Sequence, residues 1–394
     1  MSAVPVFSSR LQWSAPLNPI TELLARKREA KERIFDLTES NPTHAGIDYP
    51  AGEISRALSA GQILRYDPDP FGNRETRDAV AAYYGGQVER ERILLTASTS
   101  EAYSYLFKLL ADPGDEILAP RPSYPLFEYL ARLESVRIVQ YPLFYDHGWH
   151  FDSAALRAAV TDRTRAVVIV NPNNPTGSYL KTHELEELTA VARERDLAII
   201  SDEVFSDYWI EDDPRRVSTL APVQDVLAFS LSGLSKIVGL PQMKLGWMVV
   251  SGAAAAREAA LSRLELIVDT YLSVSAPVQA ALPALLALRG PIQQQIRWRL
   301  AANLAALRTA APLCETRVLE IEGGWYATLQ MPRMQTEEEW AAGLLERQNV
   351  FVQPGYFYDF ESEPFLILSL LTEPAIFVEG LDRLVAYVAE VTGP

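Results

Sequence analysis

Short apolar runs alternate with amphipathic stretches between about Ile93 and Ser251, and this alternation constrains the fold more than any other feature. Seven runs are visible: Ile93–Thr96, Glu116–Ala119, Val136–Val139, Ala166–Val170, Leu197–Ile200, Val226–Phe229 and Leu245–Val250. Strand-like runs separated by helical patterns are typical of parallel strands with helices on both faces. The sequence therefore predicts an α/β fold with a large, mostly parallel seven-stranded sheet between helices.

The pattern changes after this region, which indicates a second, smaller α/β domain. Apolar residues recur at helical spacing from Ile296 to Leu307, and a strand is expected around Trp325–Leu329. With 394 residues, the chain is longer than one hydrophobic core usually supports. We therefore expect an N-terminal arm over residues 1–48, a large domain over residues 49–285 and a small C-terminal domain over residues 286–394.

Charge and cysteine content narrow the partners and the compartment. The formal net charge of −15 argues against nucleic acid or an anionic membrane as a partner. The single cysteine, Cys314, excludes an internal disulfide framework and suits a reducing compartment. The N-terminus lacks a signal-peptide pattern, and no apolar run approaches the roughly 20 residues of a membrane span. We expect a cytoplasmic protein and predict no metal site.

Three polar strings follow apolar runs in a fixed order, and these strings are Asn171–Gly177, Ser201–Phe205 and Ser232–Pro241. Lys236 is the only lysine in the third string, and a covalently bound aldehyde cofactor needs an amine. Asp202 follows a buried run, so it emerges at the strand end where ligands bind in open parallel sheets. A carboxylate there can keep a pyridine nitrogen protonated, and the amide of Asn174 can donate to the ring's phenolic oxygen. The strings predict an enzyme that holds pyridoxal 5'-phosphate by an imine with Lys236.

Each of these residues also fits an ordinary role, because loop lysines are usually solvated and Asn-Pro pairs usually form turns. The prediction rests on their order and on their placement at strand ends. A phosphate site is expected at Thr96–Ala102, since hydroxyls there can cap a helix whose free N–H groups attract an anion. Tyr124 also follows a strand and can stack on the cofactor ring.

By these residues the chain resembles, along nearly its whole length, the fold-type-I pyridoxal-phosphate-dependent aminotransferases of class I and II, which are related to aspartate aminotransferase. The matching motifs are Tyr66–Gly72, the serine-rich loop at Ser98, Pro-Ser-Tyr124, Asn-Asn174-Pro-Thr-Gly, Ser-Asp202-Glu-Val, Ser-Lys236, Lys244-Leu-Gly-Trp, Glu-Gly-Gly-Trp325 and Gln-Pro-Gly355.

The resemblance implies a homodimer with active sites at the subunit boundary, where Tyr66 reaches the phosphate of the neighbouring subunit's cofactor. It also implies that the N-terminal arm packs with the small domain. The implied cofactor contacts are phosphate binding by Thr99 and Ser100, stacking by Tyr124, ring contacts from Asn174 and Asp202, and Ser235 beside Lys236. Lys236 is then both the imine and the proton shuttle.

Three residues depart from the family pattern. Phe205 stands where the family has a tyrosine that binds the phenolic oxygen, which leaves Asn174 as the expected partner and should raise the imine pKa. Lys244 replaces a phosphate-binding arginine, so the charge is kept and the bidentate fork is lost. Ile367 stands where an arginine grips the substrate α-carboxylate, and Phe365–Leu371 contains no basic residue.

This last departure leaves three hypotheses open, because a buried carboxylate without a cation is costly. The first is an aminotransferase that binds the carboxylate through another cation, with Arg10 and Arg65 as candidates, or that takes amines without one. The second is a lyase, racemase or decarboxylase on the same scaffold, and the third is a non-catalytic protein that binds the cofactor. A dinucleotide-dependent dehydrogenase is disfavoured, since no G-x-G-x-x-G follows a strand. We predict an aminotransferase that uses an amine or amino-acid donor and a keto-acid or aldehyde acceptor.

Overall fold

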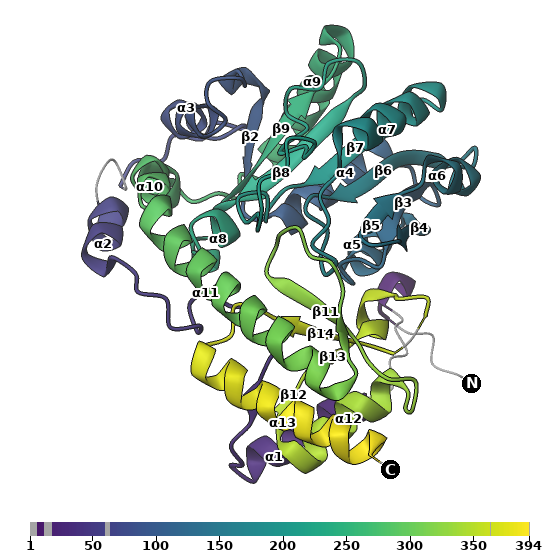
Figure 1. Ribbon diagram of the computed structural model, residues 1–394. Coiled ribbons are helices and arrows are strands. Elements are labelled where there is room, and N and C mark those ends of the chain that lie inside the picture. The colour runs from purple at the N-terminus through teal and green to yellow at the C-terminus, as the bar shows by residue number, and fades with distance from the viewer. Residues whose placement is uncertain (1–5, 12–17, 60–63, 363, 394) are drawn as a thin grey trace.

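The computed structural model describes residues 6–11, 18–59, 64–362 and 364–393, which form two lobes (Figure 1). The larger lobe contains an eight-stranded sheet in the order β2-β9-β8-β7-β6-β3-β4-β5. The strands are β2 (Ile93–Thr96), β9 (Gly246–Ser251), β8 (Ala228–Gly233), β7 (Ala198–Asp202), β6 (Thr164–Val170), β3 (Glu116–Arg121), β4 (Arg137–Tyr145) and β5 (Trp149–Phe151). The five strands from β8 to β4 are parallel, and β9 and β5 run antiparallel to their neighbours.

All seven predicted runs overlap strands of this sheet, which confirms the α/β fold. The eighth strand, β5, was not predicted, because its three residues pair with the end of β4 through a turn in which Asp146 N donates to Gly148 O. So short a strand carries almost no periodic signal.

Helices cover both faces of the large sheet. Because successive strand residues point to opposite faces, neighbouring residues pack under different helices. Ile117 packs in the core under α4 (Thr99–Leu110), α5 (Phe127–Leu133) and α9 (Ala254–Tyr271). Its neighbour Leu118 packs on the other face, under α6 (Ser153–Ala159) and α7 (Thr182–Glu194). Because the central strands are buried on both faces, a charged residue such as Asp202 lies at a strand end.

The smaller lobe has a four-stranded antiparallel sheet in the order β10-β11-β14-β13. Its strands are β10 (Arg317–Val318), β11 (Tyr326–Gln330), β14 (Phe365–Ser369) and β13 (Gln353–Pro354), and its helices are α11 (Arg289–Ala310), α12 (Glu337–Gln348) and α13 (Pro374–Thr392). The N-terminal segment lies on this lobe: β1 (Phe35–Asp36) pairs with β12 (Val350–Phe351), and α1 (Pro19–Glu29) contacts α12. We propose to keep the division into an arm (1–48), a large domain (49–285) and a small domain (286–394).

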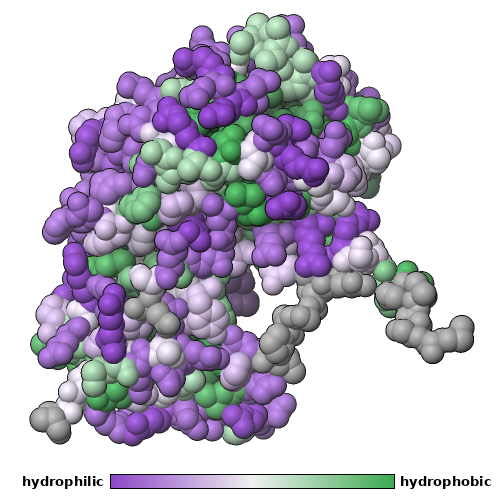
Figure 2. Space-filling view, turned by 90° about the vertical axis from the view of Figure 1, so that its right-hand side faces the viewer, coloured by the Kyte–Doolittle hydropathy of each residue, from purple (hydrophilic) through white to green (hydrophobic). Residues whose placement is uncertain are grey.

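The remaining helices of the described residues are four α-helices and five 3-10 helices. They are α2 (Ala51–Ser59), α3 (Arg74–Tyr83), α8 (Leu234–Ile237), α10 (Ala276–Ala287), and the 3-10 helices η1 (Ser9–Leu11), η2 (Arg90–Arg92), η3 (Pro241–Met243), η4 (Ala311–Cys314) and η5 (Gly355–Tyr358). In the described ranges no single helix is both long and apolar enough to cross a membrane, and α9 and α10 reach that measure only as a pair bent by 119°. On the face shown in Figure 2 hydrophilic residues predominate and apolar residues form small, separate groups.

Candidate functional site

A cavity of about 340 Å³ opens at the carboxyl ends of β6, β7 and β8. This edge of an open parallel sheet is where ligands bind, because the strand-to-helix loops there can turn their side chains toward a common point. The predicted residues that line the cavity are Thr99, Ser100, Tyr124, Asn174, Asp202, Phe205, Ser235, Lys236 and Lys244. The structure therefore brings most of the predicted site together.

Lys236 lies in α8, directly after the end of β8. Two side chains hold this short helix by donating hydrogen bonds to its main-chain carbonyls. Tyr208 Oη donates to the carbonyl of Lys236 at 2.6 Å, and Gln293 Nε2 donates to that of Ile237 at 2.8 Å. The Nζ atom lies 4.7 Å from the ring centroid of Trp325 and 5.3 Å from that of Phe205. Burial lowers the pKa of Lys236 to about 8, although the nearby Asp202 carboxylate opposes the shift. The amine is thus poised to gain and lose a proton near neutral pH.

Asp202 is the last residue of β7 and is buried. Its Oδ2 accepts a hydrogen bond from Tyr103 Oη at 3.2 Å, and its Oδ1 accepts one from the main-chain N–H of Val204 at 3.3 Å. Burial raises the pKa of Asp202 to about 6, while these two donors and the positive Lys236 favour the carboxylate. At neutral pH the group is mostly ionised, so it can pair with a protonated ring nitrogen.

The N-terminus of α4 forms the other end of the cavity. Ser98 caps the helix, since its Oγ accepts a hydrogen bond from Glu101 N at 3.2 Å, and the following Thr99 and Ser100 line the cavity. Lys244, with a φ of 50°, faces the same cavity from the loop after α8. Hydroxyls, helix N–H groups and an ammonium group together suit a phosphate.

The cavity residues fit pyridoxal 5'-phosphate by their own chemistry. The buried Oδ1 of Asn174 has no hydrogen-bond partner among the described residues, and neither do the hydroxyls of Thr96 and Ser232. A Cβ on Gly246 would lie only 2.9 Å from the carbonyl of Ser232 and 3.3 Å from Thr96 Oγ1. A side chain at this position would clash, so a glycine is required at this part of the cavity wall, and the unpaired Asn174 Oδ1 remains for a ligand to satisfy.

The site residues that were not predicted from the sequence include Ser40, Tyr103 and Tyr326, which line the cavity, and Trp325, whose ring centroid is 4.7 Å from Lys236 Nζ. Trp325 stands in a matching motif, and Tyr103 follows Thr99 by one helical turn, so both had a local signal. Ser40 and Tyr326 come from the N-terminal segment and from β11, and they form the wall of the cavity on the side of the small lobe. No local pattern links these two segments.

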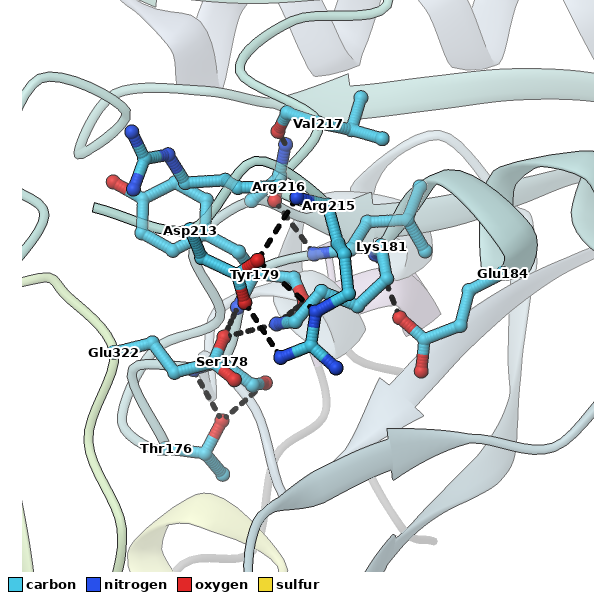
Figure 3. Close-up of polar contacts among 12 residues, drawn as sticks. Thr176, Ser178, Tyr179, Lys181, Glu184, Asp213, Arg215, Arg216, Val217 and Glu322 are labelled. Carbon is cyan, nitrogen blue, oxygen red and sulfur yellow. Dashed lines mark hydrogen bonds and ion pairs between the residues drawn. The ribbon is translucent and has the colours of Figure 1, made fainter. Parts of the chain in front are cut away.

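The loop before β11 is tied to the large lobe by polar contacts (Figure 3). The Glu322 carboxylate accepts a hydrogen bond from the main-chain N–H of Tyr179 at 2.7 Å and pairs with Lys181, while Ile210 N donates to Glu322 O at 2.9 Å. Gly177 allows the close approach, because a Cβ there would lie 2.5 Å from the carbonyl of Gly323. These contacts fix where Trp325 enters the site.

The other predicted residues lie outside the cavity of their own chain. Ile367 is 1% exposed, does not line the cavity, and lies beside Thr328 and Gln353 in the small sheet. Arg10 is exposed and donates to the carbonyl of Leu133 at 2.8 Å. Arg65 pairs with Asp67 at 3.2 Å, and the adjacent Tyr66 is 79% exposed.

Comparisons with known proteins all point to the same family. The family "Aminotransferase class I and II" matches residues 32–374. The glutamate-pyruvate aminotransferase AlaA of Escherichia coli (strain K12) is 29% identical over 269 residues, which are 67% of this chain and 66% of that protein, slightly less than two thirds of it. An alanine aminotransferase of Mycobacterium tuberculosis (strain ATCC 25618 / H37Rv) is 28% identical over 67% of this chain and 62% of its own length.

Solved structures share the fold over the whole chain. An alanine aminotransferase from Pyrococcus furiosus superimposes with a TM-score of 0.86, covers 98% of this chain and 100% of that chain, and is 23% identical.

Proposed function

Because the chain belongs to the class I and II aminotransferase family, we propose that it transfers an amino group between an amine or amino-acid donor and a keto-acid or aldehyde acceptor. The observation that carries the proposal is the meeting, in one cavity, of the Lys236 amine, the Asp202 carboxylate and the hydroxyl-lined N-terminus of α4. An amine, an acid for a ring nitrogen and a phosphate cradle are what pyridoxal 5'-phosphate requires.

In this proposal Lys236 would hold the cofactor through its amine, and Asp202 would pair with the ring nitrogen. Thr99, Ser100, Ser235 and Lys244 would hold the phosphate, and Tyr124 and Asn174 would contact the ring. When bound, the cofactor supplies an electron sink that stabilises the negative charge left on a substrate carbon after proton loss.

Lys236 Nζ is the group that moves the proton. With a pKa lowered to about 8, the free Lys236 amine would have a neutral fraction that could accept a proton from the substrate carbon. The aromatic rings of Trp325 and Phe205 lie beside Nζ and favour its position within the site. The resulting ammonium group then returns the proton as a general acid, so one residue serves as base and acid.

Tyr103 orients Asp202 for its role. Its hydroxyl fixes one carboxylate oxygen, and the N–H of Val204 fixes the other. A carboxylate whose position is set by two donors keeps its charge and its angle toward the ring nitrogen.

The assembly and compartment form part of the same proposal. We propose a homodimer in which Tyr66 reaches the phosphate in the neighbouring subunit, supported by the 79% exposure of Tyr66 and the 99% exposure of Leu64 on one loop. A single buried cysteine suits the reducing cytoplasm, where we place the protein.

A single-turnover screen tests the function. Purified protein loaded with pyridoxal 5'-phosphate is mixed with a panel of amines and amino acids, and the absorbance of the cofactor is followed. An aminotransferase gives one equivalent of carbonyl product and one of the aminated cofactor. Product without the aminated cofactor indicates a lyase or decarboxylase instead, and no conversion by any donor contradicts enzymatic activity.

A further inference from the structure

Positive charge is scarce around the cavity. Lys236 and Lys244 are the basic residues among those that line it, and both are assigned to the cofactor. Every lysine, arginine and histidine of the sequence lies in the ranges that the structure describes, and none besides these two lysines lines the cavity. Two arginines of α11 point to main-chain carbonyls: Arg299 donates to the carbonyl of Ala45, and Arg297 donates to that of Asp207 at 2.6 Å.

The cavity wall on the side of the small lobe is neutral and hydrogen-bonding. It consists of Ser40 and Tyr326, whose hydroxyls interact. Burial raises the pKa of Tyr326 above its ordinary value, and the negative charge of Glu39 raises it further, so the phenol stays protonated and can donate. Glu39 therefore adds negative potential where the wall meets a substrate.

The layer behind this wall is also uncharged. Ile367 lies opposite Thr328 and Gln353 in the small sheet, and Gln353 Oε1 accepts a hydrogen bond of 2.5 Å from Tyr358 Oη. The Thr328 hydroxyl is buried without a partner among the described residues. A substrate carboxylate that approached this side would find hydroxyls and an amide but no counter-ion.

We propose that the cavity selects amines whose substituent beside the amino-bearing carbon is uncharged and hydrogen-bonding, as in amino alcohols and amino-acid amides, and that Ser40 and Tyr326 recognise that substituent. The inference rests on the proposed aminotransferase function. A carboxylate loses its hydration on entry and gains neutral donors beside a negative residue, whereas a hydroxyl or amide exchanges its water for the Ser40 and Tyr326 hydroxyls at little cost.

The test compares matched donors on the loaded wild-type protein. Phenylalanine, phenylalaninamide and phenylalaninol form one set, with leucine and alanine sets of the same design, and the second-order constant for conversion of the cofactor is measured for each. We expect the amide or the alcohol to exceed the amino acid by at least tenfold in the best set. A smaller ratio, or a preference for the amino acid, overturns the inference and leaves the aminotransferase function standing. Failure of every donor removes both.

Two variants test the assigned residues. Tyr326→Phe and Ser40→Ala should each lower the constant for the amino alcohol at least tenfold, while the constant for 2-phenylethylamine, which lacks the substituent, stays within twofold of wild type. Equal losses for both donors would mean that the hydroxyls serve the structure and not recognition. Tyr141→Phe is the matched control, because it removes a buried hydroxyl that donates to the carbonyl of Val168 and does not line the cavity, so it should leave the ratio unchanged.

A second copy of the chain could supply a cation that binds a substrate carboxylate. If the wild-type protein prefers the amino acid and Arg65→Ala abolishes that preference, Arg65 of the neighbouring subunit supplies the charge and the inference is wrong.

Discussion

The hydroxyl of Tyr103 donates a 3.2 Å hydrogen bond to Oδ2 of Asp202, and both groups are buried. Tyr103 lies in α4, the helix whose N-terminus we propose as the phosphate site, and Asp202 ends β7. One helix therefore contacts both the phosphate end and the ring-nitrogen end of the proposed cofactor site. Because the phenol stabilises the carboxylate, Tyr103 also influences how much of Asp202 is ionised.

Asp202→Asn should slow the half-reaction by orders of magnitude with the fold intact, because the ring nitrogen loses the partner that keeps it protonated. Tyr103→Phe should slow it by about tenfold, since the carboxylate remains but loses one donor worth about 1.5 kcal/mol. Stopped-flow measurement of cofactor conversion gives both rates. Asp202→Asn with the wild-type rate would disprove the role of the carboxylate.

Lys236→Ala should abolish covalent attachment of the cofactor and lower the half-reaction rate by at least about a thousandfold, because the general base is lost with the amine. Borohydride reduction of the wild-type protein, followed by peptide mapping, should locate the adduct at Lys236. Lys244→Ala is the control: it should weaken cofactor binding and leave the adduct in place. An adduct at Lys244 in the wild-type protein contradicts the assignment.

Phe205→Tyr should lower the pKa of the linkage between the cofactor and Lys236, because a new hydroxyl can stabilise the phenolic oxygen as an anion and weaken its hold on the linkage proton. Phe205 lines the cavity, and its ring centroid is 5.3 Å from Lys236 Nζ, so the introduced hydroxyl falls within the site. A spectral pH titration measures the shift. An unchanged or higher value means that the ring of residue 205 does not face the phenolic oxygen.

Local sequence was sufficient to place Lys236 and Asp202 at the edge of the sheet, because polar residues at or just after the end of a buried strand emerge there. The same logic found all of the long strands and missed β5, whose three residues are ordered by pairing with β4. Element type and strand-end chemistry are encoded within a few residues, and those parts of the fold were predictable.

The wall formed by Ser40 and Tyr326 was not predictable in this way. These residues meet only because the N-terminal segment lies on the small lobe and β11 packs against the large one. Ile367 could be assigned to a late strand from its apolar neighbours, but only the folded structure shows that it does not line the cavity. Contacts between distant segments form this side of the cavity.

Glu203 should make the stability of the cofactor-free protein depend on pH. Burial raises the pKa of Glu203 from 4.5 to about 7 in the folded state, so the folded protein holds a proton that the unfolded chain has already lost between these values. The contribution of Glu203 to the free energy of unfolding should therefore fall by about 3 kcal/mol as pH rises from 4.5 to 7.

Glu203→Gln keeps an acceptor for Leu220 N and Ser230 Oγ and should remove most of this dependence of stability on pH. Urea denaturation of both proteins at pH 5 and pH 8 measures it, and equal slopes would contradict the prediction.

Glu39→Gln should make the cavity more tolerant of a substrate carboxylate. The charge of Glu39 acts on Tyr326, which lines the wall, so the same charge should repel an anionic substituent at that wall. Glutamine keeps the hydrogen bond that Glu39 Oε1 accepts from the main-chain N–H of Asn41 at 2.7 Å, which preserves the local turn. Because solvent partly screens the interaction, removal of this charge should change the free energy by about 1 kcal/mol, which is about fivefold in the ratio of the rate constants for amino acid and amino-acid amide.

Glu53→Gln is the matched control, because it changes the net charge equally from an exposed position on α2. A ratio that rises in Glu39→Gln and not in Glu53→Gln identifies a local electrostatic effect, whereas equal ratios in all three proteins show that the Glu39 charge does not reach the substrate.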